Sequence, residues 1–183
     1  MSFKFTGMTR LGLGTIALAG MLLTANSAKA ACGYAPLGKG VVPLPMLGQA
    51  TADWQGHEPS IIGLWQTVYK TSTGAIFNET LKQWHVDGTE FESAFLPPAA
   101  GNVCIGVWKE DGYLKIKLHH MGWLFDGTGK TTANGMFTLD EVDTLAANGN
   151  TYTGTFTFTP YTTEGAKGTA VTGTIKATRV TVD

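Results

Sequence analysis

The sequence predicts an all-β fold, a single up-and-down antiparallel β-barrel of about eight strands over residues 61–183. From residue 61 onward, threonine, valine, isoleucine and aromatic residues occur in short runs typical of strands. Gly, Asn, Asp and Pro separate these runs at a fairly regular spacing, and no segment shows a helical period. Strands joined mostly by tight turns can close into a barrel, whose interior is filled by side chains or holds one small ligand.

Each expected strand is a run of this kind bounded by turn residues. The turns "STGA", "VDGT", "EDGY" and "AANGN" carry the glycine, asparagine and aspartate that tight connections require. The longer links "PPAAGN", "DGTGKTTAN" and "TEGAKG" have the same chemistry. The predicted strands are 61–71, 76–86, 89–96, 103–109, 113–125, 135–142, 151–159 and 169–182.

The segment before the barrel divides into two parts. Residues 1–30 have a basic start, an apolar run and a final Ala-Lys-Ala, which together predict a cleaved secretory signal peptide. Residues 31–60 are rich in proline and lack periodicity, so we expect an extended N-terminal arm packed on the barrel. We therefore expect a periplasmic or secreted protein.

Charge and hydropathy exclude several partners. Removal of Lys4, Arg10 and Lys29 with the signal lowers the basic count from 13 to 10 against 14 acidic residues, a net charge of −4. The chain then lacks a basic cluster, so we expect no nucleic-acid partner. No later stretch is apolar for about 20 residues, so we expect no membrane span. Oligomeric state is left open.

The two cysteines suit an exported protein. Cys32 and Cys104 are predicted to form a disulfide between the arm and the barrel, which would stabilise the fold by about 4 kcal/mol in the chain-entropy model. The alternative is a lipid-modified Cys32. Lys29 argues against it, because a lipobox normally has an aliphatic residue at that position.

The two ends of the strand set carry a family resemblance. Gly63-Leu64-Trp65 opens the first strand, and Arg179 lies near the end of the last one. This pair resembles the calycin superfamily of lipocalins and their relatives, in which a Gly-x-Trp motif and a basic residue meet across one end of the barrel. The resemblance implies a contact between Trp65 and Arg179. The chain is shorter than ordinary lipocalins and has no helix pattern after the last strand. "QWHVDGTE", "GNVCIGVW" and "TGTFTF" also resemble small secreted bacterial proteins of uncharacterised function.

Strand parity selects two histidines as candidate site residues. If Lys115 and Lys117 face water, Leu118 and His120 face the barrel interior, and His119 faces outward. If Lys82 also faces water, the inward set on its strand is Phe77, Glu79, Leu81, Gln83 and His85. His85 and His120 would then share the interior with Glu79.

The role of these histidines stays open. They could contact a ligand or act as acid and base, in which case His85 and His120 are the catalytic residues. They could instead be hydrogen-bonded core residues, or a bulge could shift the register of either strand. A metal or haem site is the weakest option, because no close set of His, Cys and carboxylate ligands is present. We therefore expect no metal and no cofactor.

Aromatic residues indicate the kind of ligand. The residues expected to line or fill the interior are Trp65, Tyr69, Phe77, Phe91, Phe95, Trp108, Phe156 and Phe158. Of these, Tyr69, Phe91 and Trp108 join the two histidines and Glu79 as candidate ligand contacts. The main hypothesis is a calycin-like protein that binds a small hydrophobic molecule, with aromatic molecules among the candidates. The alternative is a cofactor-independent lyase or isomerase that acts on such a molecule by histidine acid-base catalysis.

Overall fold

The computed structural model describes residues 59–126 and 132–182. The predicted signal peptide 1–30, Cys32 and nearly all of the predicted arm 31–60 lie outside the described residues. In the described part, the eight strands form one closed barrel in the order β1-β2-β3-β4-β5-β6-β7-β8, and each strand is antiparallel to its neighbours. The predicted all-β up-and-down barrel is thereby confirmed.

The strand bounds lie within three residues of the predicted ones. A short 3₁₀ helix, η1, interrupts the link between β3 and β4, and no helix in the described ranges has the length or apolar character of a membrane span. The elements are β1 Gly63–Thr71, β2 Ile76–Trp84, β3 Thr89–Ala94, η1 Pro98–Ala100, β4 Val103–Glu110, β5 Lys115–Leu124, β6 Gly135–Leu145, β7 Thr151–Thr162 and β8 Val171–Arg179.

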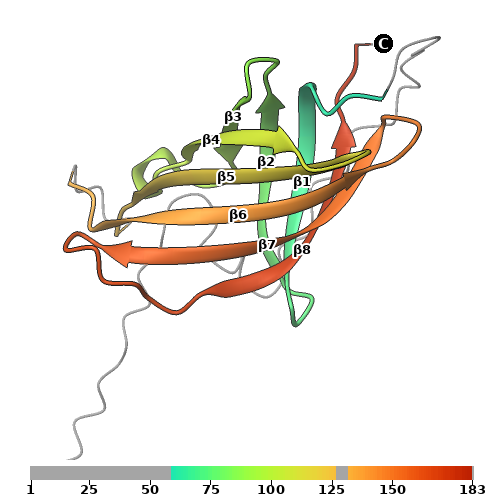
Figure 1. Ribbon diagram of the computed structural model, residues 1–183. Helices are drawn as coiled ribbons and strands as arrows, with labels where there is room; N and C mark the ends of the chain where they lie inside the picture. Colours follow the sequence, from blue (N-terminus) through green and yellow to red (C-terminus); the bar gives the residue numbers. More distant parts are fainter. Residues whose placement is uncertain (1–58, 127–131, 183) are drawn as a thin grey trace, which may run out of the picture.

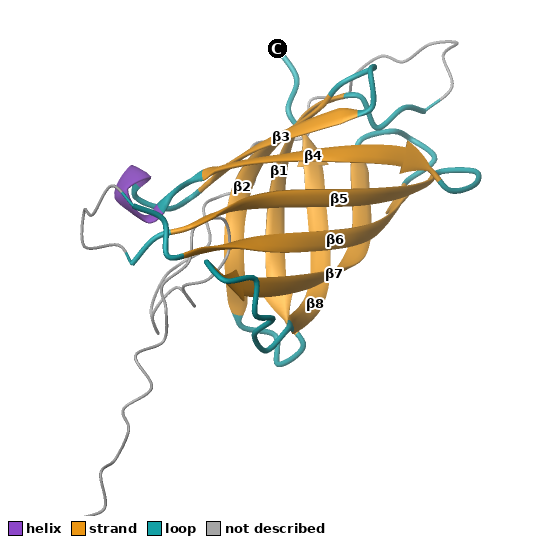
Figure 2. Cartoon of the chain, turned by 60° about the vertical axis from the view of Figure 1, so that its left-hand side comes forward, coloured by secondary structure: helices purple, strands orange, loops and turns teal. Residues whose placement is uncertain are grey.

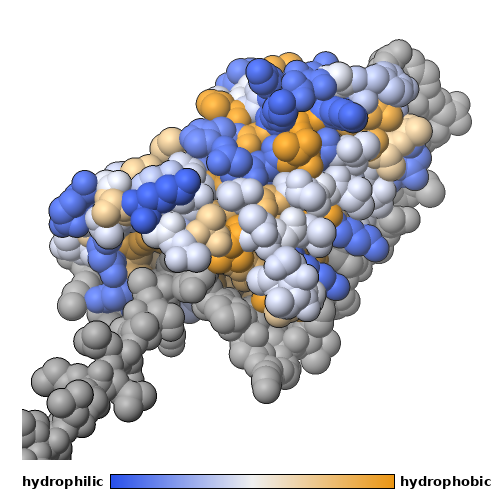
Figure 3. Space-filling model, turned by 60° about the horizontal axis from the view of Figure 1, so that its bottom comes forward, coloured by the Kyte–Doolittle hydropathy of each residue, from blue (hydrophilic) through white to orange (hydrophobic). Residues whose placement is uncertain are grey.

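The barrel is strongly tilted. In Figures 1 and 2, β5, β6 and β7 run across the front while β1 and β2 run steeply behind them. Such crossing of strands on opposite walls is expected, because strands must tilt against the barrel axis to close a sheet. The outer surface is mixed: on the face in Figure 3, hydrophobic areas lie among hydrophilic ones.

The interior contains two groups of aromatic side chains. Edge-to-face contacts connect Trp84 with Trp108 and Tyr152, and Tyr152 with Trp65. The second group consists of Phe77, Phe137, Phe156 and Phe158. Apart from the partly buried Trp108, these side chains are buried, so large hydrophobic surfaces are removed from water.

Charged side chains lie between the two aromatic groups. Lys82 Nζ is 5.4 Å from the ring centroids of both Tyr69 and Trp84. Tyr69 in turn contacts Phe156 in the second group, and His120 contacts Phe137. The centre of this barrel is therefore ionic, although both neighbouring layers are aromatic.

Candidate functional site

The predicted contact at the end of the barrel is confirmed. Trp65 and Arg179 are register partners in the β1–β8 ladder, and the Arg179 guanidinium lies 4.2 Å from the Trp65 ring centroid. Arg179 also donates hydrogen bonds to the carbonyls of Gly149, Ile62 and Ser60. Burial lowers the Arg179 pKa to about 10, so the side chain stays charged at neutral pH.

Arg179 explains the glycine of the Gly-x-Trp motif. A Cβ at Gly63 would lie 2.7 Å from Arg179 Nη1, and the Gly63 φ of 132° is one that other residues rarely adopt. Arg179 and the Trp65 Nε1 hydrogen bond to the Ile61 carbonyl hold residues 60–62 across this end of the barrel.

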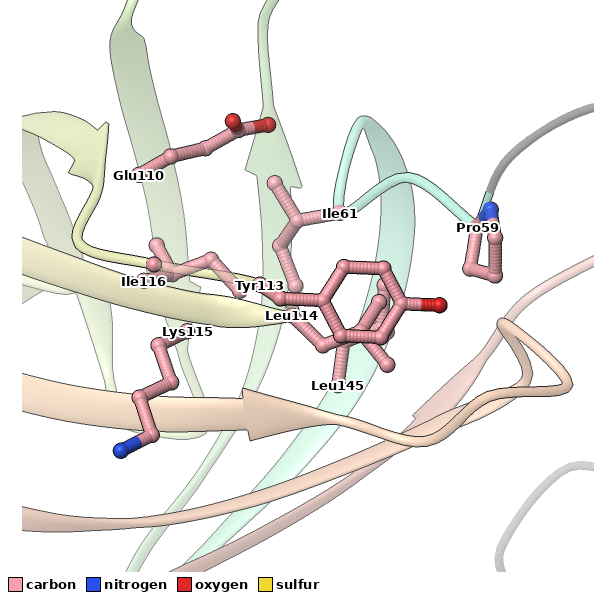
Figure 4. Close-up of a pocket in the computed structure, with 9 residues that line it drawn as sticks. Pro59, Ile61, Glu110, Tyr113, Leu114, Lys115, Ile116 and Leu145 are labelled. Carbon is pink, nitrogen blue, oxygen red and sulfur yellow. The ribbon is translucent and has the colours of Figure 1, made fainter.

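A hollow of about 380 Å³ opens beside this held segment. Figure 4 shows Ile61 reaching into it from before β1, opposite the turn between β4 and β5. Ile61, Ile116 and Leu145 supply aliphatic side chains to the lining, and Glu110, Tyr113 and Lys115 supply polar groups. The lining residues are Pro59, Ile61, Glu110, Gly112, Tyr113, Leu114, Lys115, Ile116 and Leu145.

One wall of the hollow has an unusual backbone. Leu114 has a φ of 57° and is the one non-glycine residue with positive φ in the described ranges. Its carbonyl accepts a hydrogen bond from the Leu145 N–H, which ties the β4–β5 turn to the end of β6. A bulky residue in this conformation is strained, and such strain is concentrated at functional sites in proteins.

Lys82 lies at the centre of the barrel and is fully buried. Its Nζ lies 2.6 Å from Glu141 Oε1, 3.3 Å from Glu92 Oε2 and 3.9 Å from Glu90 Oε1. The Tyr69 hydroxyl is 2.7 Å from both Glu92 Oε2 and Glu141 Oε1. Burial acts to lower the pKa of Lys82, but the charges of Glu141 and Glu92 outweigh it and raise that pKa well above its usual value.

His120 is fully buried beside the same carboxylates, as its predicted inward orientation requires. Its Nδ1 is 3.4 Å from Glu90 Oε2. Burial acts to lower the His120 pKa, but the charges of Glu92 and Glu90 raise it overall. Gly106 makes room for this pair, because a Cβ there would lie 2.5 Å from His120 Cβ and 2.9 Å from Glu90 Oε2.

The surroundings shift the pKa values of the two glutamates of β3 in opposite directions. Burial raises the pKa of Glu90 despite the opposing charges of Lys82 and His120. For Glu92, burial also acts to raise the pKa, but Lys82 and His120 outweigh it, and the pKa is lowered. Two neighbouring carboxyl groups whose pKa values are separated in this way can serve as an acid and a base.

Asp143 on β6 differs from the other acids of the described interior because no basic side chain lies within ion-pair distance of it, whereas Glu90, Glu92 and Glu141 each have one. It is fully buried, and no donor group among the described residues hydrogen-bonds to either of its carboxylate oxygens. Burial and the negative charge of Glu141 raise its pKa well above the usual value. Its carboxyl lies over Gly154, where a Cβ would be 2.0 Å from Asp143 Oδ1.

The predicted orientation of β2 is wrong. Lys82 faces the interior, so Leu81, Gln83 and His85 are exposed. His85 therefore does not share the interior with His120, and Glu90, not Gln83 or Glu79, is the group beside His120. The physical reason is that three carboxylates on β3 and β6 compensate the Lys82 charge, which parity within one strand cannot reveal.

The structure places the other candidate ligand contacts in different positions. Tyr69 faces the interior as predicted, whereas Glu79 is buried but pairs with Val68, on the opposite side of the sheet from Tyr69. Phe91 is 36% exposed and Phe95 is 52% exposed, so neither lines the interior. Glu90 and Glu92 occupy the inner face of β3 instead. Trp108 is partly buried, and its Nε1 donates to the carbonyls of His85 and Thr89.

His85, Phe91 and His119 are found together on the outside of the barrel. They line a shallow hollow of about 430 Å³ over β3, β4 and β5, with Ile105, Val107 and Met121. His119 is exposed as predicted, and its Nδ1 lies 2.6 Å from Asp140 Oδ1.

Cys104 faces the interior from β4 and is buried. The described part of the chain contains no free cysteine, but the predicted partner Cys32 lies outside it, so the Cys32–Cys104 bridge stays a prediction. Glu92, Cys104 and His120 each place one ligand atom within 4.8 Å of the others. These residues lie on β3, β4 and β5, so the fold brings together a close set of His, Cys and carboxylate groups that the spacing along the sequence did not show; the predicted disulfide at Cys104 would leave Glu92 and His120.

Sequence reasoning missed the charged residues of the interior other than His120, namely Lys82, Glu90, Glu92, Glu141 and Asp143. A signal was present for β6: Glu141 and Asp143 alternate in phase with Leu139 and Leu145, which places all four on one face. No comparable signal marks Lys82. Polar residues occur on both faces of its strand, so the sequence pattern does not show which face points inward.

Comparison with known proteins does not assign this chain to a family. The chain matches no protein-family model, no curated protein and no solved structure at a significant level.

Proposed function

We propose that the protein is a calycin-like binding protein that takes up a small, mainly apolar molecule at the Trp65–Arg179 end of the barrel. The observation that supports this most directly is the hollow of about 380 Å³ in Figure 4. Its volume is within the range of small-molecule sites, and its lining combines aliphatic side chains with polar groups that can orient a ligand. Tyr113 supplies an aromatic ring to the lining, which suits a ligand that contains a ring.

The strained turn supports the same proposal. Leu114 keeps a positive φ while its side chain packs against the core and borders the hollow. A β4–β5 turn with ordinary φ at this position would place the Leu114 side chain elsewhere. The strain is therefore consistent with a wall whose shape matters for a bound molecule.

The test is dye binding by variants of two adjacent residues. Ile61 is buried and lines the hollow, whereas its neighbour Ile62 is 36% exposed. We expect the uncharged dye N-phenyl-1-naphthylamine to bind the wild-type protein and the Ile62→Phe variant. Ile61→Phe fills the hollow and should weaken binding by at least about tenfold, a difference of roughly 1.4 kcal/mol.

Native mass spectrometry of the protein isolated from its natural host should show a retained small molecule. Equal dye binding by the Ile61→Phe and Ile62→Phe variants would contradict this location. Absence of both dye binding and a retained mass would contradict the binding function itself.

A second candidate function is favoured by the opposite pKa shifts of Glu90 and Glu92 beside His120. In this alternative, the protein is a cofactor-independent lyase or isomerase, and these three groups exchange protons with the bound molecule. His85 has no part in it, because it is exposed. Incubation of a recovered host ligand or its precursors with the protein separates the two functions. A binding protein returns them unchanged, whereas an enzyme converts one of them and loses this activity in His120→Asn.

A further inference from the structure

The outer surface of the barrel differs from one side to the other. On β7 and β8, the exposed outward side chains are threonines and a lysine: Thr153, Thr155, Thr172, Thr174 and Lys176. On β3, β4 and β5, six apolar side chains point outward instead, and between 36% and 62% of each is exposed. These six residues form what we call the apolar face: Phe91, Val103, Ile105, Val107, Met121 and Trp123.

The strand register makes the apolar face continuous. Phe91, Ile105 and Met121 are register partners across β3, β4 and β5 and form one row. The other members lie two residues before or after Ile105 on β4, or two residues after Met121 on β5, so they point to the same side of the sheet. A contiguous exposed apolar patch of this kind marks an interaction site.

Two features limit what can cover the apolar face. The barrel is closed, so β3, β4 and β5 each have both neighbours and a partner cannot add a strand to them. The charges at the border are compensated within the chain: the His119 ring pairs with Asp140, and Lys117 and Lys109 act on Asp111 in the β4–β5 turn. The face therefore favours a partner surface that is apolar and carries no net charge.

The apolar face contains both halves of a self-complementary contact. The shallow hollow of about 430 Å³ over β3, β4 and β5 is lined by four of its members, Phe91, Ile105, Val107 and Met121. Trp123 does not line this hollow and is the most exposed member of the face. Tryptophan side chains seated in apolar pockets contribute a large share of the energy of protein interfaces. The face thus offers a projecting ring and, beside it, an apolar hollow.

A two-fold axis can bring these two parts together. In a symmetric dimer the same patch meets itself, so a feature on one side of the axis contacts a feature on the other side in the second copy. An axis that crosses the strands between Trp123 and the hollow seats each Trp123 in the hollow of the other copy. The same axis places the lysine-bearing β4–β5 turns at opposite ends of the interface, where they do not repel each other.

We propose that the protein forms a symmetric dimer in which the apolar faces of two copies meet and Trp123 of each copy enters the hollow of the other. This contact is separate from the site proposed for ligand binding, because the two hollows share no lining residue. Six partly exposed side chains offer less than the ~800 Å² that each partner buries in a standard interface. We therefore expect a weak dimer that dissociates on dilution.

Sedimentation equilibrium of the intact protein between about 1 and about 200 μM tests the dimer, because this range covers the dissociation constants of weak interfaces. Trp123→Lys removes the projecting ring, and Ile105→Lys places a charge in the hollow. Each should weaken dimerisation at least about tenfold. Thr174→Lys adds the same charge at an exposed position on β8 and should leave the dimer unchanged.

Oxidative footprinting of the wild-type protein examines the same face without any variant. In the dimer, the oxidation rates of Met121 and Trp123 should fall as the protein concentration rises. The rate for Tyr161, which is partly exposed on β7, should stay constant and serves as the internal control.

A wild-type protein that stays monomeric over the whole concentration range would overturn the proposal. Equal dimerisation of Trp123→Lys, Ile105→Lys and Thr174→Lys would show that the copies meet through another surface. Protection of Met121 and Trp123 in a monomer, independent of concentration, would assign the apolar face to another part of this chain. Binding of monomers to phosphatidylcholine vesicles that is lost in Trp123→Lys would assign it to lipid, and either result would contradict the dimer.

Discussion

At the scale of single residues, Lys82 shows how a lysine can occupy the centre of a small barrel. Lysine is rarely buried unless its charge is compensated. Here Glu141 and Glu92 lie 2.6 and 3.3 Å from its Nζ, and the ring centroids of Tyr69 and Trp84 each lie 5.4 Å from it. The Tyr69 hydroxyl lies 2.7 Å from an oxygen of each carboxylate, so its single proton adds a hydrogen bond to the buried ion pair.

Lys82→Met tests the importance of this cluster for stability. The substitution leaves Glu92 and Glu141 buried without their cation, so we expect the free energy of unfolding to fall by about 3–5 kcal/mol. Lys117→Met is the matched control: Lys117 is about half exposed and pairs with Asp111 at the surface, and its loss should cost at most about 1 kcal/mol. Urea denaturation measures both values. Similar losses in the two variants would show that the buried pair contributes no more than a surface pair.

At the scale of the strands, prediction succeeded where the residues of one strand determine its orientation. In β5, exposed Lys115, Lys117 and His119 alternate with buried Ile116, Leu118 and His120, as parity requires. In β2 the same reasoning failed, because the groups that bury Lys82 belong to β3 and β6. The fold was predictable from the residues, and the Trp65–Arg179 contact was expected from the resemblance to calycins. The charged cluster depends on pairings between strands that a single sequence does not reveal.

The start of β1 provides a test at this scale. Gly63→Ala must accommodate both an unfavourable φ of 132° and an Arg179 nitrogen 2.7 Å from the new Cβ. We expect it to reduce stability by at least about 3 kcal/mol. Gly74→Ala separates the two causes, since Gly74 has a φ of 84° but no atom within 4 Å of a Cβ; it should cost only about 1–2 kcal/mol. Thermal denaturation of both variants compares them, and equal losses would mean that Arg179 moves aside without cost.

At the scale of the whole molecule, the interior acids make the stability of the barrel depend on pH in two opposing ways. The raised pKa of Asp143 means that its protonated form is favoured in the folded state. Its contribution is complete below the ordinary value of 3.8 and is lost as pH rises through the folded pKa. The lowered pKa of Glu92 has the opposite effect: its contribution is present above the ordinary value of 4.5 and is lost as pH falls through the folded pKa.

Two uncharged variants should therefore show opposite pH trends. Relative to wild type, Asp143→Asn should become more stable as pH rises above about 4, because the variant does not carry the cost of ionising Asp143. Glu92→Gln should be least stable relative to wild type at neutral pH, and the difference should shrink as pH falls below about 4.5. Melting temperatures across this range measure both trends. Parallel curves for the two variants would contradict the opposite assignment of these acids.

The pairing of β1 with β8 also has a consequence for the order in which the chain can fold. β1 is the first strand to be synthesised, yet its second neighbour is the last. Bringing together segments so far apart in sequence costs chain entropy before any contact repays it, so closure of the ring is expected to be a slow, late step. Until β8 docks, both β1 and the exposed side of β7 present unpaired backbone groups to other chains. Incomplete chains that end before β8 should therefore be the species of this protein most prone to aggregation.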